Sequence, residues 1–147
     1  MNKNAWKSVG AVFAGMLTGI VLSLGTDVVL HTARVFPPWG QPVPDALLLL
    51  ATVYRTIFGV AGSYVAARLA PDRPMLHALV LGTLGLAVST VGAVVTWNMG
   101  PAFGPHWYPV ALVVLAMPTA WIGGKLYGSQ LRAGSAAEAS TLGRKVL

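Results

Sequence analysis

Residues 74–97, with the sequence PMLHALVLGTLGLAVSTVGAVVTW, contain no Asp, Glu, Lys or Arg. An α-helix needs about 20 predominantly apolar residues to cross the hydrocarbon core of a bilayer, and this stretch supplies them. Pro74 suits the first turn of a helix, and Gly100 and Pro101 follow soon after its end. The stretch therefore predicts a membrane-spanning helix over about 75–97.

Three more apolar runs lie on either side of this stretch, and clusters of Pro and Gly at 37–44, 71–74 and 100–105 separate the runs. Because such clusters interrupt helices, each run forms a span of its own. Residues 133–147 are small and polar, and we expect them to form a mobile tail behind a single transmembrane domain over 1–132. The predicted spans are about 8–35, 46–70, 75–97 and 107–130.

The composition agrees with a chain that resides in lipid. Of its 147 residues, 55% are hydrophobic and 10% charged, and the mean hydropathy is +0.67, which is too apolar for an ordinary soluble domain. The absence of cysteine excludes disulfides and thiol chemistry in this chain. We expect no nucleic-acid partner, because membrane topology explains the net charge of +6 better than a basic binding face does.

The distribution of Lys and Arg predicts the orientation of the helices. Cytoplasmic loops carry an excess of these residues, and Arg34 alone falls on the opposite side of the predicted spans. We therefore expect an all-α bundle of four transmembrane helices in the inner membrane, with both termini cytoplasmic. The residues on the cytoplasmic side are Lys3, Lys7, Arg68, Arg73, Lys125, Arg132, Arg144 and Lys145.

Small residues at helical spacing mark the faces on which helices in lipid approach one another closely. All four predicted helices carry such a stripe, and the stripe in 75–97 is the most regular. The stripes indicate tight packing within one chain, and the stripe of the last helix is equally compatible with a homo-oligomer. The predicted packing residues are Gly15, Gly19, Gly59, Gly62, Gly82, Gly85, Gly92, Ala120, Gly124 and Gly128.

Asp27 and Arg55 are the charged residues that fall well inside the predicted spans. Either one alone costs about 2.5 to 3.5 kcal/mol at the centre of a membrane. Both lie on small-residue stripes, roughly 12 and 15 Å below the outer ends of their helices at about 1.5 Å per residue. We therefore expect the two side chains to point into the bundle and to form an ion pair.

Further polar side chains lie towards the outer ends of the helices and predict a pocket that opens to the outer face. Arg55 would anchor an anion, a lipid headgroup or a small polar ligand there, and Asp27 would hold Arg55 in place. The alternative is a structural ion pair that only fixes helix register. The candidate ligand-binding residues are Asp27, His31, Tyr54, Arg55, Asn98 and His106.

Two other functions stay open. One is a small oligomeric transporter of a polar or anionic solute that uses Asp27 as a titrating carboxylate, although the neighbouring Arg55 favours the ionised form and argues against it. The other is an enzyme acting on a lipid-soluble substrate, for which the sequence offers no catalytic motif. His31 and His106 are simpler to interpret as interfacial side chains than as ligands of a haem or metal, so we expect no cofactor and no metal.

Four segments carry a resemblance to known sequences: GTDVVLH (25–31), FPPWG (36–40), YRTIFGVAGSYVAARLAPDRP (54–74) and GPHWYP (104–109). They are similar to a group of small, uncharacterised bacterial four-helix integral membrane proteins. The resemblance implies a multi-pass location in a bacterial membrane, and it carries no activity or site. The function we expect is that of a non-enzymatic binding, accessory or structural membrane protein.

Overall fold

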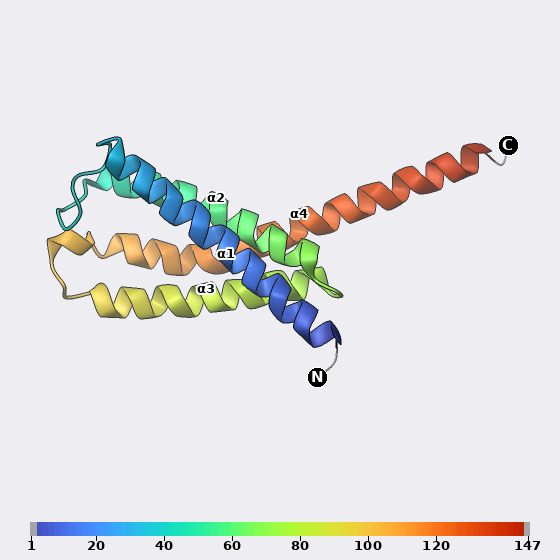
Figure 1. The fold of residues 1–147 in the computed structure, drawn as a ribbon, viewed down its shortest axis with the longest axis horizontal. Coiled ribbons are helices and arrows are strands. Elements are labelled where there is room, and N and C mark those ends of the chain that lie inside the picture. The colour runs from blue at the N-terminus through green and yellow to red at the C-terminus, as the bar shows by residue number, and fades with distance from the viewer. Residues whose placement is uncertain (1–2, 146–147) are drawn as a thin grey trace.

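The structure, a computed structural model that describes residues 3–145, consists of four long α-helices and one short 3-10 turn (Figure 1). Each of the four helices is long and apolar enough to cross a membrane, in agreement with the all-helical prediction. The elements are α1 (Lys3–Thr32), α2 (Asp45–Leu69), α3 (Pro74–Thr96), η1 (Pro101–Phe103) and α4 (Trp107–Lys145).

Helix α2 is the central element, because it packs against each of the other three helices. Helix α3 lies alongside α4, whereas α1 crosses the bundle obliquely and contacts α3 only over a short stretch (Figure 1). The connections α1–α2 and α3–α4 lie together at one end of the bundle, here called the distal end (Figure 1). The start of α1 and the α2–α3 connection lie at the other, proximal end. From there α1 runs obliquely away from α3 towards the distal end.

Direct contact between backbones joins α1 to α2. A Cβ atom added to Gly15 would lie 2.5 Å from the carbonyl oxygen of Gly62, and one added to Gly62 would lie 2.6 Å from that of Gly15. One turn further along α1, a Cβ added to Gly19 would lie 3.7 Å from the carbonyl oxygen of Phe58. The crossing at Gly15 and Gly62 therefore depends on the absence of side chains at both positions.

Helix α4 also uses small residues for its contacts with the rest of the bundle. A Cβ atom added to Gly123 would lie 2.5 Å from the carbonyl oxygen of Val60, and one added to Gly124 would lie 2.8 Å from the Sδ atom of Met75. Gly123 was not predictable as a packing residue, because the neighbouring Gly124 continues the regular stripe of small residues. The remaining close contacts are Gly82 with Ala120 and Gly59 with Thr119.

Three predicted packing glycines do not contact another helix. A Cβ atom added to Gly85, Gly92 or Gly128 would meet nothing within 4 Å in the described part of the chain. Because α1 diverges, it does not lie opposite the distal half of the α3 stripe. Gly85 and Gly92 therefore have open space where an opposing helix was expected. Gly128 is partly buried near the point where α4 leaves the bundle.

Helix α1 ends at Thr32, three residues before the predicted end at position 35. Arg34 adopts a φ angle of 58°, in the left-handed region, and turns the chain out of the helix. The amides of Val35 and Phe36 both donate to the carbonyl oxygen of Leu30, at 2.9 and 3.1 Å, which completes a helix-terminating turn.

Helix α4 does not give way to a separate tail at 133–147 but continues through Lys145. Residues 133–145 are rich in alanine, which favours helix, and no proline follows Pro118. Beyond the bundle this part of α4 projects on its own (Figure 1), and its side chains from 131 to 141 are exposed. The end of the predicted tail, 146–147, lies outside the described residues.

Candidate functional site

A polar cluster links α1 to α2 within their apolar surroundings. Asp27 of α1 is buried, with 7% of its surface exposed, and its Oδ2 atom accepts a 2.5 Å hydrogen bond from Nη2 of Arg55 on α2. The other carboxylate oxygen, Oδ1, accepts a hydrogen bond from the hydroxyl of Tyr54. Both oxygens of the buried carboxylate are therefore paired, and the charges of Asp27 and Arg55 offset each other.

Apolar side chains cover this cluster on its distal side. The ring of Tyr54 is buried in a small core with Phe36 and Ala51. Phe36 belongs to the α1–α2 connection, and Tyr108, from the first turn of α4, packs against the same core together with Leu47. The polar cluster is thus separated from the distal loops by packed hydrophobic residues.

Arg55 keeps a buried hydrogen-bond donor without a partner in the described residues. Its Nε atom is buried and makes no hydrogen bond within residues 3–145, whereas Nη2 donates to Asp27. A buried donor of this kind costs about 1 to 3 kcal/mol when it stays unpaired, and it is rare enough to require an explanation. The unpaired Nε is the most unusual feature of the cluster.

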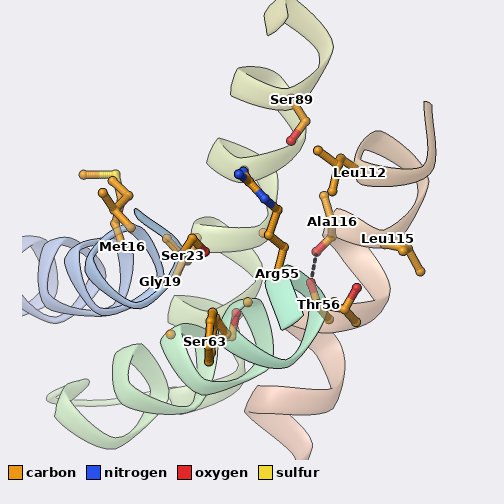
Figure 2. A pocket seen from close by; sticks show the side chains of 18 of the residues that line it. Met16, Gly19, Ser23, Arg55, Thr56, Ser63, Ser89, Leu112, Leu115 and Ala116 are labelled. Atoms are coloured by element: carbon orange, nitrogen blue, oxygen red, sulfur yellow. Dashed lines mark hydrogen bonds between the residues drawn. The ribbon is translucent and has the colours of Figure 1, made fainter. Parts of the chain in front are cut away.

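A cavity of about 370 Å³ lies beside Arg55 in the interior of the bundle. All four helices line it: α1 with Met16 and Ser23, α2 with Arg55, α3 with Ser89, and α4 with Leu115, among others (Figure 2). Figure 2 shows the guanidinium end of Arg55 directed away from α2, towards the part of the cavity where Ser89 lies. Arg55 is therefore shared between the ion pair and the cavity.

The cavity wall is mostly apolar and carries a few hydroxyl groups. Thr56 and Thr119 use their hydroxyls within their own helices, donating to the carbonyl oxygens of Thr52 and Ala116 at 2.7 and 2.9 Å. The side chains of Ser23 and Ser89 also line the cavity and make no hydrogen bond in the described part of the chain. Arg55, Ser23 and Ser89 thus present polar groups to an otherwise hydrophobic space, the usual character of a ligand pocket.

The cavity differs in place and membership from the outward-opening pocket expected from the sequence. Asp27 and Tyr54 hold Arg55 but do not line the cavity. His31, Asn98 and His106 lie at the distal end of the bundle and do not join it. The expected residues therefore divide into a polar cluster of three and three separate distal residues.

The two distal histidines are held by their own loops. His31 stacks on Trp39 with ring centroids 3.7 Å apart, and its Nδ1 lies 2.8 Å from the carbonyl oxygen of Asp27. His106 stacks on Trp97 at 4.2 Å, with Nε2 2.9 Å from the carbonyl oxygen of the same residue. The stack on Trp39 holds the α1–α2 connection against α1, and His31 and Trp39 also line a separate distal pocket of about 520 Å³. Asn98 and His106 do not line that pocket.

The groups on the cavity wall determine which contacts a bound molecule could make. The residues that line it include one guanidinium and several hydroxyls, and they include no carboxylate or histidine that could act as a base for a hydroxyl. Within residues 3–145, no three His, Asp or Glu side chains come together as a metal site would require. A ligand held here would be recognised by hydrogen bonds to its oxygen atoms and by apolar contact.

A comparison of the chain with protein families, curated proteins and solved structures finds no match. The class of protein is therefore defined by the fold and the cavity: an all-helical protein with four helices able to cross a membrane and a cavity among them.

Proposed function

We propose that this chain is a non-enzymatic, multi-pass membrane protein that binds a lipid or small polar ligand in the cavity beside Arg55. The single observation that carries the proposal is the buried Nε atom of Arg55, which lacks a partner in residues 3–145 and belongs to a side chain lining the cavity. An oxygen atom of a ligand would accept a hydrogen bond from Nε and remove the cost of leaving this donor unpaired.

The proposal places the protein in a bacterial inner membrane with both termini in the cytoplasm. The support is the distribution of Lys and Arg, because Arg34 is the one such residue in the two distal connections, 33–44 and 97–106. The distal end of the bundle then faces outwards. The cavity lies within the membrane, roughly 15 Å below the distal start of α2, since Arg55 comes ten residues after Asp45.

Transport driven by protons is a weaker alternative. A carboxylate that binds and releases protons needs access to a proton donor, whereas both oxygens of Asp27 are engaged by Tyr54 and Arg55. The same contacts suit a carboxylate whose task is to position a guanidinium. The geometry therefore favours ligand binding by Arg55 over titration of Asp27.

Two glycine variants on α3 provide a matched test of ligand binding. Gly85 lines the cavity, and Gly92 lies two turns away on the same stripe outside it. Because an added Cβ atom would meet nothing within 4 Å at either position, Gly85→Leu and Gly92→Leu should both fold. Only Gly85→Leu places a bulky side chain in the cavity.

The measurement is native mass spectrometry of protein released from mild detergent after extraction from its host membrane. We expect wild-type protein and Gly92→Leu to retain the same non-covalent mass and Gly85→Leu to lose it, while far-UV circular dichroism shows all three to be equally helical. A mass that Gly85→Leu retains equally, or no retained mass even after host lipid extract is added back, would contradict the proposal.

A further inference from the structure

We infer that the ligand is an uncharged, single-chain amphiphile that enters the cavity from the bilayer through the gap between α1 and α3. This inference rests on the proposed function and adds the chemical class of the ligand and its route of entry.

The route follows from how α1 is placed. Near Leu81 of α3, α1 approaches closely, since a Cβ added to Gly15 would lie 3.0 Å from a methyl group of Leu81. Further along α3 the facing residues Gly85 and Ser89 line the cavity, and Gly85 has open space in front of it. The two helices thus meet at one level and separate distally, which leaves the cavity open along its side.

The residues at this open side belong to the lipid-facing surface. Ile20 and Leu24 of α1 line the cavity and are also 46% and 57% exposed, and Val88, next to Ser89, is 71% exposed. No residue of either distal connection lines the cavity, and the core around Phe36 and Tyr54 separates the polar cluster from those loops. A molecule dissolved in the bilayer therefore reaches Arg55 more directly than a molecule dissolved in water.

The headgroup is uncharged because the site already contains a balanced pair. Asp27 neutralises Arg55, so an anion in the cavity would leave a net negative charge in apolar surroundings, which is strongly unfavourable. The buried Nε atom of Arg55 needs an acceptor, and the hydroxyls of Ser23 and Ser89 add further polar groups. An ester, alcohol or ketone oxygen meets this need without adding charge.

The size of the cavity sets the number of chains. The cavity has a volume of about 370 Å³ and is open along the gap between α1 and α3. A headgroup at Arg55 and the first carbons of one hydrocarbon chain fill this volume, the rest of that chain extends through the gap into the bilayer, and no room is left beside it for a second chain. The apolar residues Met16, Leu81 and Leu112 line the space that the chain would occupy.

Four probe molecules distinguish the charge of the headgroup, the need for a hydrocarbon chain and the number of chains. The full chain is placed in nanodiscs of phosphatidylcholine, which itself tests a two-chain lipid, and is titrated with one added probe at a time. Glycerol monolaurate has an uncharged head and one chain, dodecyl phosphate has the same chain length with an anionic head, and glycerol monoacetate keeps the uncharged head but lacks the chain. Bound probe is counted by native mass spectrometry for wild-type protein, Gly85→Leu and Gly92→Leu.

The inference predicts that wild-type protein and Gly92→Leu retain glycerol monolaurate, that Gly85→Leu does not, and that the other two probes are retained at least about tenfold less. Equal retention of glycerol monoacetate would show that the ligand needs no hydrocarbon chain. Stronger retention of dodecyl phosphate would contradict the uncharged headgroup, and retention of phosphatidylcholine would contradict the limit to one chain. In each of these cases sensitivity to Gly85→Leu would leave the proposed function intact. If no added probe and no lipid binds in a way that Gly85→Leu abolishes, the proposed function fails as well.

Discussion

Replacing Asp27 or Arg55 alone should destabilise the protein more than replacing both together. Removing one partner of a fully buried ion pair costs about 3 to 5 kcal/mol, because the other charge remains buried without compensation. The side chain of Arg55 is 33% exposed, so the pair is not fully buried and the expected loss is smaller. We therefore expect Asp27→Asn and Arg55→Gln each to lower the free energy of unfolding by about 2 to 4 kcal/mol.

The double variant Asp27→Asn, Arg55→Gln leaves two neutral amides that can bond to each other and to Tyr54. We expect it to recover about 1 to 3 kcal/mol relative to the sum of the single changes. The free energy of unfolding is measured by titrating the protein in mixed micelles with sodium dodecyl sulfate and following helix content by circular dichroism.

Asp45 and Arg68 supply the matched control pair, because they lie at opposite ends of α2 and make no ion pair with each other. The variants Asp45→Asn and Arg68→Gln should be additive within about 0.3 to 0.5 kcal/mol. If the Asp27 and Arg55 variants are additive to the same degree, the two side chains do not interact, and the description of the polar cluster is wrong.

Three further predictions concern the scaffold. Gly123→Ala should lower the free energy of unfolding by more than about 1 kcal/mol, because its Cβ would lie 2.5 Å from the carbonyl oxygen of Val60. Gly128→Ala, whose Cβ would meet nothing within 4 Å, should raise the free energy of unfolding by about 0.5 to 1 kcal/mol. Equal effects of the two variants in the same micelle titration would contradict the α2–α4 contact. Arg34→Gly should stabilise the protein by about 1 kcal/mol, because Arg34 has a φ of 58° and glycine adopts this conformation without strain. The thermal midpoint should therefore rise slightly, and a lowered midpoint would argue against this helix-ending turn. A chain truncated after Gln130 should unfold within a few degrees of the full chain, since residues 131–141 are exposed and Gln130 itself bonds Tyr64; a large loss would show that this part of α4 packs on the bundle.

The helices were predictable from the sequence because a membrane span requires a long apolar run and the chain interrupts these runs with Pro and Gly. The predicted bounds of 46–70 and 75–97 lie within one residue of Asp45–Leu69 and Pro74–Thr96. The end of α1 was harder to predict, because an arginine takes the left-handed conformation that glycine usually supplies. The helical end of α4 was missed because small polar residues are as common in linkers as in exposed helices.

The polar cluster was predictable for an energetic reason. Two opposite charges inside spans are costly apart and inexpensive together, so Asp27 and Arg55 could be paired without knowledge of the fold. Tyr54 adds its hydroxyl to the same carboxylate from the position next to Arg55.

The cavity was not predictable, because it depends on the angle at which α1 crosses the bundle. The stripe on α3 indicates close packing along its whole length, yet α1 leaves it after Leu81, and Gly85 and Ser89 line an open space instead. The prediction of an outer pocket used the depth in the membrane of His31, Asn98 and His106 and no information about the direction of their side chains. Depth alone does not bring the three residues together: His106 stacks on Trp97, whereas His31 stacks on Trp39 and lines a separate distal pocket.

The most direct test of ligand binding beside Arg55 is a cryo-electron microscopy map of the protein in lipid nanodiscs, with an antibody fragment bound to add mass. The binding account predicts elongated density in the cavity, with one end within about 2.7 to 3.2 Å of the Arg55 Nε atom and the other along Met16 and Leu81. A closed cavity, in which α1 packs along the whole of α3 and a protein oxygen accepts from Nε, would contradict it.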